Sequence, residues 1–114
     1  MASEKNFENK IKQFLKDNNC YYVKYFANRM TKVGVPDILA CVNGYFVGIE
    51  VKAENGVPSE LQIYNIEQIR NAGGIAVIVR PSDWEEFKYL INTLLADQIE
   101  GGRQVADDIN SKFF

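Results

Sequence analysis

Apolar residues recur every three or four positions between residues 3 and 18, with lysines and glutamates between them. This spacing places the apolar side chains along one side of a helix and predicts an amphipathic helix over the segment. The apolar side is formed by Phe7, Ile11, Phe14 and Leu15.

The pattern then changes to one that is typical of strands. Residues 20–26 are aromatic and β-branched, and two apolar runs follow at residues 36–42 and 45–52. The pair Asn43-Gly44 separates the two runs, and this dipeptide favours a two-residue hairpin turn. We therefore expect a strand, a basic connection over residues 27–34, and an antiparallel hairpin.

The second half of the chain alternates helix and strand. Pro58-Ser59-Glu60 opens a second helix that runs to about Asn71, residues 75–79 form an aliphatic strand, and residues 82–95 form a third helix. Because a helical crossover joins parallel strands, the last strand should pair in parallel. The expected fold is α/β, an αβββαβ core whose mixed sheet is flanked by helices, with an extra C-terminal helix and a tail.

The length of 114 residues suits one compact domain, which we assign to residues 1–95. Residues 96–114 are polar around Gly101-Gly102 and are expected to form a tail that is either loosely held or docked on a partner or in a dimer. No apolar run approaches the roughly 20 residues of a membrane span, and the first ten residues lack the apolar stretch of a secretory signal. We expect a cytoplasmic protein with no membrane partner.

Composition narrows the chemistry that the chain can perform. It has no histidine, so catalysis would depend on carboxylates, lysines and a metal ion. Cys20 and Cys41 lie in apolar segments without the paired spacing of a zinc site and are expected to be buried thiols. The net charge is −2, but residues 1–56 carry eight Lys and Arg against six Asp and Glu. This half is the expected nucleic-acid surface, with contacts predicted at Lys24, Arg29 and Lys32.

The hairpin carries the candidate site. Asp37 is six residues before Asn43 and Glu50 is six residues after Gly44, so a two-residue turn places the two carboxylates opposite each other. Side chains alternate along a strand, so Glu50 and Lys52 point to the same face. Two close carboxylates remain ionised when a hard divalent cation binds them, which favours Mg²⁺, with Mn²⁺ as a substitute.

The alternative interpretation of this hairpin is an ordinary acid pair with Lys52 in a surface salt bridge. Residues 38–42 and 46–49 are almost entirely apolar, which indicates that the strands are largely buried. Opposed acids in buried strands would be costly without a cation, so the metal site is the preferred interpretation.

These motifs resemble a known family. GVPD at residues 34–37 and EVK at residues 50–52 are similar to the signature of the PD-(D/E)xK nuclease superfamily. With the Asn-Gly hairpin and SELQ at residues 59–62, the set resembles the VRR-NUC branch over about residues 4–80. That branch includes stand-alone phage and bacterial proteins and the nuclease domains of larger repair enzymes. The resemblance implies a restriction-endonuclease-like fold and a Mg²⁺-dependent endodeoxyribonuclease.

The resemblance also implies a role for each matching residue. The implied metal ligands are Asp37, Glu50, the backbone carbonyl of Val51, and Glu8. Lys52 corresponds to the motif lysine, which holds the attacking water, lowers its pKa together with the cation, or neutralises charge on the phosphate.

Two further assignments fall on helices. Glu8 corresponds to the first-helix glutamate that completes the site in related nucleases and archaeal junction resolvases. Glu4, one turn earlier, fits the pattern about as well, and we prefer Glu8 because its spacing to Ile11 and Leu15 places it beside the apolar side. Gln62 corresponds to a glutamine that points at the site and positions water or phosphate; otherwise it is an ordinary polar residue in the first turns of a helix.

We therefore expect a catalytic set of Asp37, Glu50, Lys52, Glu8 and Gln62 that hydrolyses a DNA phosphodiester. A domain this small favours a homodimer, and two active sites suit branched DNA such as a four-way junction. The alternatives are a flap or nicking nuclease that works with a helicase partner, and a catalytically silent module that only binds nucleic acid. A structural protein with a chance motif ranks last.

Overall fold

The computed structural model describes residues 2–28, 30–98 and 100–113. This part of the chain is mixed α/β, with one four-stranded sheet and four α-helices. The elements follow in the order α1 (Ala2–Asp17), β1 (Tyr21–Lys24), β2 (Ile38–Val42), β3 (Tyr45–Val51), α2 (Glu60–Asn71), β4 (Ile75–Val79), the 3₁₀ turn η1 (Pro81–Asp83), α3 (Trp84–Ala96) and α4 (Glu100–Phe113). None of these helices is both long and apolar enough to cross a bilayer.

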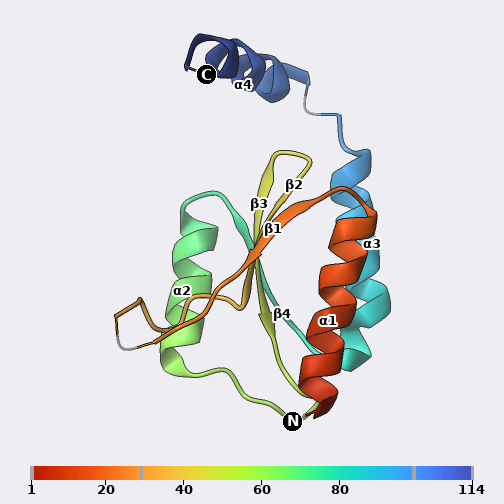
Figure 1. Cartoon of the computed structure of the whole chain (residues 1–114), viewed down its shortest axis with the longest axis vertical. Helices are drawn as coiled ribbons and strands as arrows, with labels where there is room; N and C mark the ends of the chain where they lie inside the picture. Colours follow the sequence, from red (N-terminus) through yellow and green to blue (C-terminus); the bar gives the residue numbers. More distant parts are fainter. Residues whose placement is uncertain (1, 29, 99, 114) are drawn as a thin grey trace.

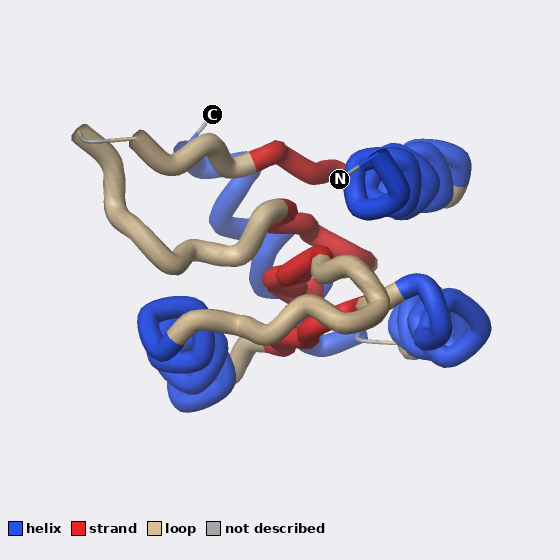
Figure 2. Tube along the Cα trace, turned by 90° about the horizontal axis from the view of Figure 1, so that it is seen from below, coloured by secondary structure: helices blue, strands red, loops and turns tan. Residues whose placement is uncertain are grey.

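The sheet has the strand order β1-β2-β3-β4. The first three strands are antiparallel, and β4 is parallel to β3, as the helical crossover through α2 predicted. One side of the sheet packs against α1 and α3, and α2 lies on the other side (Figures 1 and 2). The helices cover the two sides of the sheet unequally, because α2 packs mainly against β3 and β4.

The hairpin of β2 and β3 has the predicted register. Ile38 pairs with Ile49 and Val42 pairs with Tyr45, which leaves a two-residue turn. The turn residues Asn43 and Gly44 have φ angles of 50° and 87°, a conformation that Asn and Gly adopt more readily than other residues. Continued by one residue, this register brings Asp37 opposite Glu50.

The hydrophobic core lies between the sheet and the pair α1 and α3. It combines Phe7, Ile11 and Leu15 of α1 with alternate residues of the strands, because every second strand side chain points to this side. Trp84 at the start of α3 meets Phe7 edge to face and stacks on Phe87. The aromatic contacts fix the first helix against the third, which places the polar side of α1 near the end of β1.

The prediction that both cysteines are buried is wrong for Cys41. Cys20 is buried, but Cys41 is exposed on β2. Its neighbours in register are Tyr21 on β1 and Phe46 on β3, and both are also exposed. These three residues point to the α2 side of the sheet, where Phe46 borders a groove beside α2 and Tyr21 and Cys41 line a cavity together with residues of α4. The apolar sequence of β2 did not reveal this exposure.

The predicted tail contains a helix that its polar composition did not indicate. Val105 and Ile109 of α4 are one helical turn apart, are both exposed, and form a short apolar stripe. Figure 1 shows α4 beyond the end of α3, above the turn between β2 and β3. Asn43 connects this end to the hairpin, since its side-chain amide donates to the carbonyls of Leu94 and Asp97 at 2.9 and 2.8 Å and its Oδ1 accepts from Arg103.

Candidate active site

Asp37 is the residue just before β2, and both neighbouring strands hold it. Its backbone carbonyl accepts a hydrogen bond from the Tyr25 N–H at 2.8 Å, which extends the pairing of β1 with β2. Its carboxylate Oδ2 accepts from the backbone N–H of Val51 at 2.9 Å. The side chain therefore replaces a backbone carbonyl as the acceptor at the end of β3, and its orientation is fixed.

Glu50 lies on β3 and is only 2% exposed. Its Oε2 accepts a hydrogen bond from Gln62 Nε2 at 3.0 Å and has Lys52 Nζ at 3.5 Å. Its Oε1 is buried and has no hydrogen-bond donor among the described residues. A buried carboxylate oxygen without a partner is unfavourable, and binding of a proton or of a cation at this atom would relieve the cost.

The electrostatics of the acid pair agree with that geometry. Burial, and then the negative charge of Asp37, raise the pKa of Glu50 to about 7, and the Lys52 ammonium opposes the change. The two carboxylates thus cannot both ionise easily without an added cation. Hard carboxylate oxygens are the ligands that Mg²⁺ and Mn²⁺ prefer, so the residues present fit a divalent cation.

The number of acids at the site is two. Within the described residues, no group of three or more acidic or cysteine side chains is close enough to hold a metal ion. The carbonyl of Val51 belongs to the same strand end as Asp37 and Glu50, and its role as a ligand remains a prediction.

Gln62 has two functions in the structure. Its backbone N–H donates to Ser59 Oγ at 3.2 Å and its Oε1 accepts from the Ser59 N–H at 2.8 Å, which forms a capping box at the start of α2. Its Nε2 is then free to donate to Glu50. From the sequence, Gln62 was either a residue that points at the site or an ordinary residue of the first helical turn. In the structure it does both, because one end of its amide caps the helix and the other contacts Glu50.

Glu8 lies on α1 and is 7% exposed, but it does not touch the acid pair directly. Its Oε1 accepts from Lys24 Nζ at 2.8 Å, and its Oε2 has Lys12 Nζ at 2.8 Å. Burial alone would raise the pKa of Glu8, but the hydrogen bonds and charges of Lys12 and Lys24 outweigh burial and lower it. Glu4 makes no ion pair among the described residues, whereas Glu8 is linked to Asp37 through Lys24.

Lys24 connects Glu8 to the acid pair. Its ammonium lies 3.4 Å from Asp37 Oδ1 as well as 2.8 Å from Glu8. Burial lowers the pKa of Lys24, but the contacts with Glu8 and Asp37 outweigh burial and raise it. This side chain, which we predicted to contact nucleic acid, is mostly buried in ion pairs.

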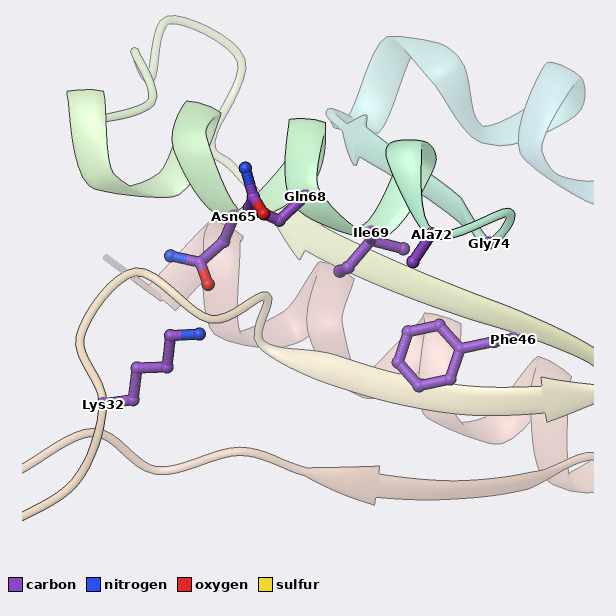
Figure 3. Close-up of a pocket in the computed structure, with 7 residues that line it drawn as sticks. All are labelled: Lys32, Phe46, Asn65, Gln68, Ile69, Ala72 and Gly74. Atoms are coloured by element: carbon purple, nitrogen blue, oxygen red, sulfur yellow. The ribbon is translucent and has the colours of Figure 1, made fainter.

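The other predicted nucleic-acid contacts lie in the connection between β1 and β2. Arg29 lies outside the described residues. Lys32 is exposed and borders a groove of about 360 Å³ on the α2 side of the sheet (Figure 3). The groove is lined by Lys32, Phe46, Asn65, Gln68, Ile69, Ala72 and Gly74, and it includes neither Asp37 nor Glu50.

Comparison with known proteins does not assign this chain to a family. No protein-family model and no curated protein matches the sequence. The case for a function therefore depends on the geometry of Asp37, Glu50 and Lys52.

Proposed function

We propose that this protein is a metal-dependent nuclease that hydrolyses DNA phosphodiester bonds at the pair Asp37 and Glu50. One observation carries the proposal: the buried Glu50 Oε1 has no hydrogen-bond donor among the described residues, while the carboxyl group faces that of Asp37. Bound there, Mg²⁺ or Mn²⁺ would polarise the phosphate and acidify a bound water.

The residues of the chain have separate tasks in this proposal. Asp37 and Glu50 would hold the cation together with the carbonyl of Val51, and the hydrogen bond from the Val51 N–H orients Asp37. Gln62 orients Glu50 through the bond to Oε2. Lys52, 3.5 Å from that same oxygen, holds the attacking water or neutralises charge on the phosphate as the transition state forms.

Features near the site support nucleic acid as the substrate. The connection that leads from β1 to Asp37 exposes the apolar side chains of Phe26 and Met30, at 70% and 92%, and the basic side chain of Lys32. Exposed aromatic and basic groups on one loop suit base stacking and phosphate contact. The order of elements and the mixed sheet are also compatible with the restriction-endonuclease-like core of the VRR-NUC family, which we include in the proposal.

The proposal extends to a homodimer that cuts branched DNA. Helix α2 exposes Leu61, Ile63 and Tyr64, and α4 exposes Val105 and Ile109, so both helices present apolar surface that a second copy can cover. Two sites related by a twofold axis would cut a four-way junction at symmetric positions.

The test is cleavage of labelled four-way junctions, flaps, single strands and plain duplex, with Mg²⁺, with Mn²⁺ and with chelator. Asp37→Asn and Lys52→Met should lose metal-dependent cleavage, and Glu67→Gln, which changes an exposed acid on α2, should retain it. Symmetric cuts in the junction support the dimer. Binding of junctions without cleavage of any substrate would overturn the proposal and favour the silent binding module.

A further inference from the structure

The surroundings of Glu8 argue against the metal-binding role that the family resemblance gave it. Both of its carboxylate oxygens already have a lysine ammonium at 2.8 Å, from Lys24 on one oxygen and Lys12 on the other. Lys5 adds a third ammonium at 3.8 Å. Glu8 is thus surrounded by ammonium groups, whereas Glu50 faces a second carboxylate and has one ammonium, that of Lys52, at 3.5 Å.

A lysine ammonium separates the acid on α1 from the acid pair of the hairpin. Lys24 Nζ contacts Glu8 at 2.8 Å and Asp37 Oδ1 at 3.4 Å, so the ammonium lies between the two carboxylates. On that side, a cation held by Asp37 and Glu50 would meet Lys24 before Glu8. The absence of any three-acid group among the described residues agrees with this arrangement.

We propose that Glu8 does not bind the cation but is a positioning residue, which holds the Lys24 ammonium against Asp37 Oδ1. This inference rests on the proposed function, because it concerns the cation site at Asp37 and Glu50. Each carboxylate of the pair then has one ammonium beside it, Lys24 for Asp37 and Lys52 for Glu50.

The arrangement has two consequences for the site. The two carboxylates and the two ammonium groups of these pairs have a net charge of zero. One bound divalent cation therefore gives the site an excess of positive charge, which attracts a phosphodiester. A second cation would meet two ammonium groups and no free carboxylate. The inference therefore specifies a site for one cation per protomer.

The experiment measures Mn²⁺ binding to the metal-free protein in the absence of DNA, with free Mn²⁺ counted by electron paramagnetic resonance. Wild type is compared with Glu8→Gln, Lys24→Met and the double variant that carries both changes. Lys12→Met is the matched control, because it removes the other ammonium from Glu8 without touching Asp37.

We expect wild type to bind one Mn²⁺ per protomer and the double variant to bind it with a Kd within about threefold of wild type, because the double change removes a neutral pair. Glu8→Gln alone leaves Lys24 unpaired beside Asp37 and should weaken binding several-fold, whereas Lys24→Met should tighten it. Lys12→Met should stay within about twofold. If Glu8 is a ligand, the double variant loses binding more than tenfold, and this result would overturn the inference.

Asp37→Asn separates failure of this inference from failure of the proposed function. If wild type binds no Mn²⁺, or if Asp37→Asn binds it as well as wild type does, the proposed cation site is wrong. If Asp37→Asn and the double variant both lose Mn²⁺, only the positioning role is wrong. Circular dichroism checks folding, and if the double variant is unfolded, Lys24→Met decides, since weaker binding there contradicts the inference.

Discussion

Glu8 and Glu50 are both buried acids, and their surroundings have opposite effects on them. Glu8 is 7% exposed and Glu50 is 2% exposed, yet the pKa of Glu8 is lowered and that of Glu50 is raised to about 7. Two lysine ammonium groups lie 2.8 Å from the carboxylate of Glu8, whereas Glu50 faces another carboxylate and has a single ammonium at 3.5 Å. Burial alone therefore does not distinguish the two acids. The charges beside them do, and the second carboxylate next to Glu50 is what makes Glu50 the candidate cation ligand.

The largest expected difference between the two acids is in catalysis. Glu50→Gln should lower the single-turnover cleavage rate by about 10³-fold, because it removes a charge that holds the cation. Glu8→Gln should lower the rate by only about tenfold, as expected for a residue that acts through another. Equal losses in the two variants would remove the distinction between a ligand and a positioning residue.

Cation binding should stabilise the protein through Glu50 and not through Glu8. Mg²⁺ at 100 times its Kd should raise the free energy of unfolding of wild type by about 2.7 kcal/mol, since a ligand of the folded state stabilises that state. Urea unfolding with Mg²⁺ and with chelator measures the difference. It should disappear in Glu50→Gln and persist when Glu8→Gln and Lys24→Met are combined, and the reverse pattern would contradict the assignment.

Without metal, Glu50 should destabilise the protein at high pH. Its raised pKa means that its favourable contribution is complete below its ordinary pKa of 4.5 and is lost as the pH rises through about 7. Glu50→Gln should therefore raise the free energy of unfolding by about 2 kcal/mol at pH 8 and by little at pH 4.5. Thermal unfolding in chelator across this range is the measurement, and a gain independent of pH would contradict it.

Glu8 should show the opposite pH dependence. Its lowered pKa means that its contribution is present above its ordinary pKa and is lost as the pH falls through the lower value in the folded state. Glu8→Gln should lower the free energy of unfolding by about 1.5 kcal/mol at neutral pH, because it removes the charged hydrogen bond from Lys24 and the ion pair with Lys12. The same unfolding series, extended to acid, should show the difference shrinking.

The smallest expected effect concerns Gln62. Ser59→Ala removes only the helix cap, whereas Gln62→Met removes the cap and also the donor to Glu50. Loss of the cap should lower the free energy of unfolding by about 1 kcal/mol in each variant. The cost of Ser59→Ala should not change with pH. That of Gln62→Met should grow above pH 7, where Glu50 is ionised, and parallel curves in chelator would show that the bond to Glu50 contributes nothing.

Local spacing was enough to predict the acid pair. The turn at Asn43-Gly44 sets the register of the hairpin, and the register brings Asp37 opposite Glu50 whatever the rest of the chain does. The parallel strand β4 was likewise predictable, because a helix between two strands leaves few other connections. These features depend on residues that are close in sequence or on general rules of chain connection.

Only the tertiary structure decided which charges compensate which acids. Lys24 reaches Glu8 and Asp37 across 16 and 13 positions of the chain, and that contact requires α1 to pack beside the end of β1. The exposure of Cys41 likewise depends on which strands α2 covers. Periodicity shows which side of an element is apolar, but it does not show which element packs there, and the partner of a buried charge determines its chemistry.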